Sequence, residues 1–486
     1  MTDVYCYKMK NERYPDAPFH PGCSFPELKR LPYEVEIDLQ NEVYSAVREI
    51  LRNLDLDKEN CGTEEWNPFG KYISEGMKVL IKPNMVFHEH PYGDEYMQGM
   101  ITHASVLRPI IDYVLLATKG KCEIIIGDCP VQSADFNKVK KVSGIADLVE
   151  FYSKQGIDIS VRDMRKIISE KNSDGVLVHT EKNPNRSSNE YVLVDLKEKS
   201  ELIDVIDRAH RFEITDYRYG DVAKHHNSLC NEYMIPKEVL EADFIINIPK
   251  LKTHRKAGIT CAMKNMVGVN GDKTCIAHHT RGFQASGGDE FNHKKIKKMV
   301  EVRVWNWLKS FKLGIWIATK VKRFYKRTIW HGKNMKEFYM ENMQTDVSEG
   351  NWYGNDTIWR CVKDINKIVL YSDKQGNMKN TVQRNYLCIV DAVIAGEGEG
   401  PMEQTNKPFC VVFGGENPVF VDYTAAKLMK FSYKAIPLIL NGFNNRWWGL
   451  ASKTAENVVI DGNMELDKIC VFFKPSSGWS EKLVEE

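Results

Sequence analysis

The chain has 486 residues, of which 43% are hydrophobic and 27% are charged, and its formal net charge is +1. This length predicts roughly two or three domains, and the composition is that of an ordinary globular protein. The near-zero net charge excludes a global electrostatic field that would attract nucleic acid or a membrane to the whole molecule.

The twelve cysteines are scattered, and no two of them have C-x-x-C spacing. The sequence therefore has no zinc-ribbon motif and no built-in iron–sulfur cluster motif. The first residues lack the apolar stretch of a signal peptide, and no run reaches the roughly 18 apolar residues of a spanning helix. We therefore expect a protein of the reducing cytoplasm. The composition leaves its cofactor unknown, and a divalent metal is considered below.

The first predicted elements are an arm and a helix. Residues 1–35 are rich in proline, polar and aromatic residues, so we expect them to form an irregular N-terminal arm. Residues 36–56 carry apolar side chains at helical spacing, which predicts a surface helix.

A βαβ unit follows the first helix. An apolar strand begins at Met77, a helix is expected over 103–118 with Thr102 as its N-cap, and a second strand covers 121–128. Two strands joined by one helix in about 50 residues are typical of a parallel pair with a right-handed crossover.

The chain then alternates between polar and buried segments. A strand is expected at 157–161, and a polar insertion of hairpins or loops near 166–235 includes a strand at 191–194. The apolar run Phe244–Ile248 predicts a strand covered on both faces, which Pro249 should end because proline cannot donate to a ladder.

Residues 276–384 predict a mainly helical insertion with a basic, aromatic-rich stretch. Residues 291–336 hold 14 Lys or Arg and one acidic residue, Glu301. This amphipathic stretch could lie on an anionic membrane surface, cover an acidic substrate, or bury its aromatic face as an ordinary helical insertion. It contains no recognised nucleic-acid-binding motif, so we expect no specific nucleic acid partner.

The fold predicted from this pattern is α/β, with a mostly parallel sheet, helices on both faces and the inserted basic helical region. The core has a first part at 36–275 and a second part at 385–486 that includes the C-terminal tail. The second part is preceded by a helix at 355–370, and its own predicted elements are strands at 385–394 and 409–413, a glycine-rich turn at 396–401, a helix at 421–429 and a last strand at 468–473.

Polar clusters repeatedly follow the apolar strands. Lys250, Lys252 and His254 come at alternate positions after Phe244–Ile248, so they point to one side if the chain stays extended. Ligands of open α/β sheets bind outside the carboxyl ends of the strands. If the strands are parallel neighbours, one pocket gathers lysines, histidines and carboxylates, a mixture that suits a small anion.

Three roles are predicted for these side chains. Lys82, Lys252 and His254 are the candidate catalytic residues, because a lysine among other cations can have a pKa low enough for proton transfer. The candidate metal ligands are the carboxylates of Asp128, Asp391, Glu397 and Glu399. The candidate substrate-binding residues are Asn84, Thr102, His103, Lys250, Thr253, Lys264 and Asn265.

The ordered set of motifs resembles a known family. The segments are IKPNMV (81–86), TH (102–103), GDCP (127–130), NIPKLKTH (247–254), MKNMVG (263–268) and DAVIAGEGEGP (391–401). Together they resemble the family called domain of unknown function 362, over about residues 77–445 with an interruption at 276–384. The resemblance implies an α/β core and little settled biochemistry. Some members carry ferredoxin-type iron–sulfur modules, which the cysteines of this chain do not provide.

Two functions are consistent with these features. The first is a cytoplasmic enzyme acting on a small anionic metabolite, a carboxylate or a phosphate, with acid–base chemistry and metal assistance. The second is a non-catalytic accessory or binding protein at an anionic membrane surface, reached through 291–336, for example in envelope glycan or lipid metabolism. The first predicts that Lys252 or His254 lies in one pocket with Lys82, Asp128 and Glu399.

Overall fold

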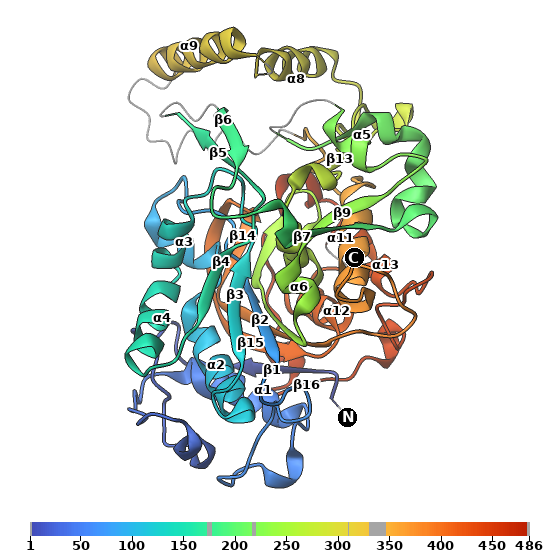
Figure 1. Ribbon diagram of the computed structural model, residues 1–486. Coiled ribbons are helices and arrows are strands. Elements are labelled where there is room, and N and C mark those ends of the chain that lie inside the picture. The colour runs from blue at the N-terminus through green and yellow to red at the C-terminus, as the bar shows by residue number, and fades with distance from the viewer. Residues whose placement is uncertain (1, 173–176, 216–219, 310, 330–346, 484–486) are drawn as a thin grey trace.

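A mixed ten-stranded sheet organises the protein (Figure 1). The computed structural model describes residues 2–172, 177–215, 220–309, 311–329 and 347–483. The strands of the sheet follow the order β16-β1-β15-β14-β10-β2-β3-β4, and β11 pairs with β14 and β12. Their bounds are β1 Val4–Lys8, β2 Lys78–Pro83, β3 Glu123–Asp128, β4 Ser160–Asp163, β10 Phe244–Ile248, β11 Lys250–His254, β12 Gly258–Thr260, β14 Asn385–Glu399, β15 Glu403–Gly415 and β16 Ile460–Gly462.

Most neighbouring strands of this sheet run parallel, which confirms the predicted α/β class. Strands β14, β10, β2, β3 and β4 are parallel neighbours, and β15 runs antiparallel to both β14 and β1. The register aligns Ile246 with Ile81 and Ile81 with Ile126. The carboxyl ends of β10, β2 and β3 therefore lie side by side at one edge of the sheet.

Helices cover both faces, as the near-continuous apolar strands predict. Phe244 and Ile246 pack in a core with α1 (Glu42–Asn53), α2 (Ala104–Thr118) and α4 (Ile145–Lys154), whereas Ile245 packs in the opposite core. That second core contains α7 (Ala262–Asn265), α11 (Ile358–Tyr371) and α12 (Pro418–Leu428). Figure 1 shows α2 and α4 on one side of the strands and α11 and α12 on the other.

The N-cap of α2 differs from the prediction. His103, not Thr102, caps the helix: its backbone is extended and its Nδ1 accepts a hydrogen bond from the N–H of Ser105 at 3.3 Å. The Thr102 hydroxyl instead donates to the carbonyl of Ile248 at 2.7 Å. Thr102 therefore ties the start of α2 to the end of β10.

Two further predictions in the sheet are wrong, and long-range pairing explains both. The expected irregular arm contains β1, which pairs with β15 about 400 residues later and with β16. The expected glycine turn at 396–401 is mostly strand, because β14 continues to Glu399 against β15. A local polar or glycine-rich composition did not prevent either segment from completing a ladder.

The C-terminal tail also differs from its predicted structure. The expected strand at 468–473 is absent, since Leu466–Ile469 form the short helix α14 and the residues up to 473 pair with no strand among those described. The apolar residues there pack without a ladder: Ile469 and Phe473 are buried in the second core.

The predicted insertions contain small elements outside the main sheet. The strand expected at 191–194 is β7 (Tyr191–Asp195), which pairs with β9 (Glu232–Pro236). α11 lies in the region expected to be an insertion, yet it packs on the sheet. The other elements are α3 Phe136–Val142, β5 Ile167–Lys171, β6 Leu177–Lys182, β8 Phe212–Glu213, α5 Asp221–His225, α6 Lys237–Glu241, β13 His279–Thr280, α8 Ile296–Lys309, α9 Lys312–Ile329 and α13 Pro437–Gly442.

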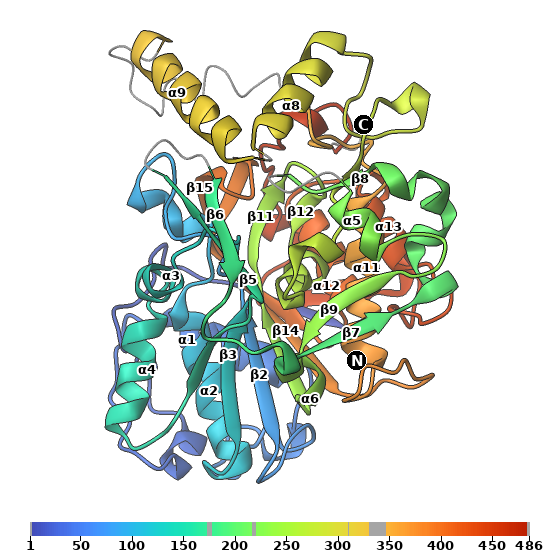
Figure 2. The ribbon, with the colours of Figure 1, turned by 45° about the horizontal axis from the view of Figure 1, so that its top comes forward.

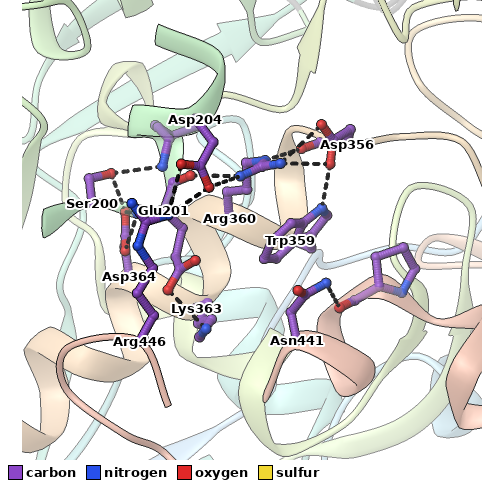
Figure 3. A network of polar contacts seen from close by, with 12 residues as sticks. Ser200, Glu201, Asp204, Asp356, Trp359, Arg360, Lys363, Asp364, Asn441 and Arg446 are labelled. Carbon is purple, nitrogen blue, oxygen red and sulfur yellow. Dashed lines mark hydrogen bonds and ion pairs between the residues drawn. The ribbon is translucent and has the colours of Figure 1, made fainter. Parts of the chain in front are cut away.

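The charges buried around α11 are paired with one another (Figure 3). Lys363 and Lys367 both contact the carboxylate of Glu201, at 2.9 and 2.5 Å, and Lys367 also lies 3.4 Å from Asp364. The Ser200 hydroxyl donates to the same Asp364 carboxylate. Two cations and two carboxylates thus balance, as buried ions usually do.

Candidate functional site

A cavity of about 350 Å³ opens at the carboxyl ends of β2, β3 and β11. Its walls also include residues from β5, from the loop after α7 and from the segment around residue 350. Positive side chains outnumber negative ones in this lining. The charged residues of the lining are Lys82, Lys171, Lys252, Arg255, Lys256, Lys264, Lys273, Asp128 and Glu349.

The cavity brings half of the predicted site residues together. Those that line it are Lys82, Asn84, Asp128, Lys252, His254, Lys264 and Asn265. Those that lie outside it are Thr102, His103, Lys250, Thr253, Asp391, Glu397 and Glu399. Of the residues expected to share one pocket, Lys82, Asp128, Lys252 and His254 do so. Glu399 does not, although its ion-pair partner Arg255 lines the wall.

Lys82 and Asp128 form a closed buried pair at the base of the cavity. The Lys82 ammonium lies 2.7 Å from Asp128 Oδ1 and also donates to the carbonyl of Pro83 and the side chain of Asn265. The Asp128 carboxylate accepts from the backbone N–H groups of Met85 and Cys129. The three contacts of the Lys82 ammonium are all with groups of the protein itself, and its predicted catalytic role stays a prediction.

Gly268 permits this pair to exist, because a Cβ there would lie 2.0 Å from Asp128 Oδ1 and 2.6 Å from Lys82 Nζ. We expect Gly268→Ala to lower the free energy of unfolding by about 1–3 kcal/mol, since neither atom can move without breaking a buried contact. Urea denaturation measures this effect. An alanine variant as stable as the wild type would contradict the tight packing of the pair.

A chain of amides positions Lys252 beside the pair. The Lys252 ammonium donates to Asn84 Oδ1 at 2.8 Å and to the carbonyl of Met100. Asn84 Nδ2 donates to Asn265 Oδ1 at 2.8 Å, and Asn265 Nδ2 donates to Asn247 Oδ1 at 2.7 Å. These amides come from three separate elements, so the network fixes the strand ends relative to α7. Burial, and then the charges of neighbouring lysines, hold the pKa of Lys252 well below its ordinary value.

His254 presents one ring nitrogen to the cavity. Its Nδ1 accepts from the backbone N–H groups of Lys256 at 3.1 Å and Ala257 at 3.3 Å. Burial and the charges of Lys264 and Lys252 keep the pKa of His254 well below its usual value, so the ring is neutral near pH 7. With Nδ1 accepting, the proton of the neutral ring resides on Nε2, where it can donate to a ligand.

Lys264 differs from the other lysines of the wall because its ammonium has no hydrogen-bond or ion-pair partner within the described part of the chain. Burial is the main reason that its pKa falls to about 7, followed by the charge of Lys273 and then that of Lys256. Lys256 behaves similarly, with a pKa lowered by burial to about 8, and its ammonium donates to the carbonyl of Glu349. Lys264 is therefore close to half-protonated at neutral pH.

Lys250 does not join the cavity, although it was expected to point with Lys252. A register shift between these residues aligns Lys250 with Asp391 but Lys252 with Gly396 of β14. The Lys250 ammonium lies 2.6 Å from Asp391 Oδ2 and donates to the Tyr14 hydroxyl at 2.6 Å. This irregularity in the strand directs the Lys250 side chain to Asp391, with which it forms a second buried ion pair.

The other predicted binding residues also have structural partners. The N–H of His103 donates to Asp391 at 2.9 Å, and the His103 ring stacks on Tyr14. The Thr253 hydroxyl donates to the carbonyl of Gly398. None of these groups faces the cavity.

The four carboxylates expected to hold a metal lie on separate partners. Asp128 faces Lys82 and Asp391 faces Lys250, while Glu397 lies 3.1 Å from Lys407 and Glu399 lies 2.9 Å from Arg255. Within the residues described, no group of three or more His, Cys, Asp or Glu side chains is arranged to hold a metal ion. The predicted metal ligands are thus not brought together, because each faces a nearby cation instead.

Comparison with known families supports the resemblance seen in the motifs. The profile described as Domain of unknown function (DUF362) matches residues 79–181 and 195–427, and every residue that lines the cavity lies within these ranges. The chain belongs to the DUF362 family.

No curated protein matches this DUF362 chain significantly. Among solved structures, it is similar to the crystal structure of a structural-genomics protein from Thermotoga maritima, with 8% sequence identity and a TM-score of 0.33. The match covers 78% of this chain and 57% of the Thermotoga protein. This likeness is too distant to transfer a function.

Sequence reasoning missed several charged or titratable residues of the DUF362 cavity, namely Lys171, Arg255, Lys256, Lys273, His278 and Glu349. Lys256 continues the alternation of Lys252 and His254, so the same pattern could have found it. Lys273 and His278 lie in a segment without periodicity, and only the folding of that loop over the strand ends places them at the site.

A helix that spans a membrane needs about 20 consecutive, predominantly apolar residues. Within the described ranges, no helix is both long enough and apolar enough to cross a bilayer.

Proposed function

We propose that this protein is an enzyme that binds a small anionic metabolite, a carboxylate or a phosphate, in the cavity and transfers a proton there. The observation that carries this proposal is the excess of unpaired positive charge in the cavity wall. Lys252, Lys256, Lys264 and Lys273 have no carboxylate within 4.0 Å in the part of the chain that the structure describes.

This excess of unpaired positive charge distinguishes the cavity from the buried charges around α11. The lysines around α11 each face a carboxylate, whereas those of the cavity face backbone carbonyls, amides or open space. Grouping cations in a partly buried wall is unfavourable unless an anion enters to neutralise them. A carboxylate or phosphate offers both the charge and the acceptor oxygens that ammonium groups and the Nε2–H of His254 require.

The pKa of Lys264 supports acid–base chemistry. A group with a pKa of about 7 can accept or deliver a proton at neutral pH, which is the range that suits a general acid or base. We assign proton transfer to Lys264, and anion binding to Lys256, Lys273 and His254. The Lys252 ammonium is held by Asn84, and we assign it to positioning the anion and to adding positive charge to the site. We assign no metal ligands in this cavity.

Anion binding should weaken as pH rises, which tests the proposal directly. Below pH 7 Lys264 is protonated in the folded protein, and above it the charge is lost. We expect the affinity for a dicarboxylate to fall about tenfold between pH 7 and 8, and more steeply above pH 8, where Lys256 also loses its charge. The measurement is the thermal shift produced by succinate at constant ionic strength between pH 6 and 9, because a ligand at 100 times its Kd stabilises the fold by about 2.7 kcal/mol.

Chloride at the same ionic strength is the control for non-specific screening. Inorganic phosphate, whose own ionisation changes in this range, is measured at pH 6.5 only, as the second ligand class. If neither anion shifts the melting temperature more than chloride does, the cavity does not bind small anions and the proposal fails.

A further inference from the structure

The consecutive helices α8 and α9, called the α8–α9 hairpin below, lie at one end of the molecule, away from the helices α1, α2 and α4, and diverge from their junction (Figures 1 and 2). The hairpin rests on the body through a few contacts near the cavity. Asn172, next to the cavity residue Lys171, donates to the Thr319 hydroxyl of α9 at 3.1 Å. Val302 of α8 lines a small cavity with Thr215 and Glu349, which also line the large one.

The outer faces of both helices are apolar. On α9, Gly314 and Ala318 are buried, whereas Leu313 and Trp316 are 64% and 59% exposed. On α8, Ile296 is 60% exposed, and other apolar residues one and two turns later share its face. The exposed apolar residues of the hairpin are Ile296, Val300, Val304, Trp307, Leu313, Trp316, Val321 and Phe324. Soluble proteins seldom expose apolar side chains so densely on adjoining helices unless the surface contacts something.

The same stretch concentrates the positive charge of the chain. Residues 291–336 hold 14 Lys or Arg against Glu301, although the whole chain carries only +1. The rest of the molecule is therefore net negative. Exposed cations such as Lys294, Lys297 and Lys320 lie among the apolar residues of the two helices. The part of this stretch at 310 and 330–336 lies outside the described residues.

We propose that the α8–α9 hairpin lies in the plane of an anionic lipid bilayer, with its outer apolar residues among the acyl chains and its lysines at the lipid headgroups. Helices with apolar residues on one face and Lys or Arg beside them bind membranes in this way. The charge distribution also orients the molecule, because the basic end is attracted to the surface and the acidic remainder is repelled.

Other occupants fit this surface less well. A second copy of the chain would bring two strongly basic stretches together, which repel each other. A nucleic acid would find phosphate-binding lysines, but aliphatic side chains such as Ile296, Val300 and Leu313 provide neither stacking nor base readout. The proposal is independent of the function assigned to the cavity.

Flotation of the full-length protein tests the inference, with phosphatidylcholine vesicles that contain or lack phosphatidylglycerol. We expect binding only to the anionic vesicles, and loss of that binding at high salt. Changing Lys294, Lys297 and Lys320 together to glutamine should weaken binding about 100-fold, or about fivefold for each charge. Leu313→Ser with Trp316→Ser should weaken it at least tenfold at unchanged thermal stability, because both side chains are exposed.

Two outcomes overturn the proposal. One is failure of the wild type to float with anionic vesicles, or equal flotation of the hairpin variants. The other is a wild-type dimer in native mass spectrometry that the Leu313→Ser, Trp316→Ser variant dissociates, which would assign the surface to a second copy. The Lys264→Met variant should float like the wild type. If it does not, the cavity rather than the hairpin holds the lipid, and the surface assignment is wrong.

Discussion

Replacing Lys264 by methionine is expected to abolish anion binding and turnover while making the fold more stable. Methionine keeps the length of the side chain but removes an ammonium that has no partner among the described residues. We expect the succinate-induced thermal shift to disappear, with at least a 100-fold loss of affinity. We also expect the free energy of unfolding to rise by about 1–3 kcal/mol at pH 7, because a partly buried cation without a counter-ion among the described residues is removed.

The pH dependence of this stabilisation follows from the lowered pKa of Lys264. The pKa is about 7 in the folded protein and 10.5 in the unfolded chain. Below pH 7 both states carry the proton, and the fold bears the full penalty of the buried charge. Between pH 7 and 10.5 the folded protein has released the proton, so the penalty shrinks as pH rises. The difference in stability between variant and wild type should therefore be largest near pH 6 and vanish only above about pH 10.5.

A matched control is Lys141→Met, on the exposed surface of α3. It should leave both anion binding and stability within about 0.5 kcal/mol of the wild type. If Lys264→Met binds succinate as tightly as the Lys141 variant does, Lys264 does not face the anion. If it is less stable than the wild type, Lys264 has a partner that stabilises the fold.

Replacing Lys82 by methionine is expected to have the opposite effect on stability. Its ammonium and the Asp128 carboxylate are both buried, at 2.7 Å, and removal of the lysine leaves the carboxylate without its counter-ion. We expect the free energy of unfolding to fall by about 3–5 kcal/mol. Urea denaturation at pH 7 measures this loss.

A double-mutant cycle shows whether the loss comes from the pair. Lys82→Met combined with Asp128→Asn removes both charges, so the double variant should be more stable than Lys82→Met alone, with a coupling of about 1–3 kcal/mol. The surface pair Lys154 and Glu150, whose side chains are 70% and 65% exposed, is the control and should change stability by less than about 1 kcal/mol. Additive effects of the Lys82 and Asp128 substitutions would refute a coupled buried pair.

Much of the fold could be predicted because the core strands are long apolar runs. Phe244–Ile248 has apolar residues on both faces, which only a sheet covered on both sides satisfies. By contrast, β1 and the end of β14 owe their structure to a partner strand. The arm around β1 is rich in proline and polar residues, and the end of β14 is glycine-rich near Gly396, so the local composition of both segments favours a loop.

The candidate site was predicted in its location and only partly in its residues. Lys252, His254 and Lys264 follow strand or helix segments that the pattern identified, and they do line one cavity. Lys82 and Lys250 differ from this group because the ion pairing of a lysine depends on which side chains the fold brings close to it. Lys82 and Lys250 looked equivalent to Lys264 in the sequence, but each has a carboxylate within 3 Å in the fold.

The sequence by itself determined the family, the α/β class and the edge of the sheet at which polar residues gather, since local apolar runs and ordered motifs encode these features. Only the tertiary structure decided which cations are paired. A register shift between β11 and β14, which aligns Lys250 with Asp391 but Lys252 with Gly396, separates the two lysines, and the loop after α7 brings in Lys273. The charge state of a lysine depends on burial and on the charges around it. These belong to the fold as a whole, and they distinguish Lys264 from the other lysines.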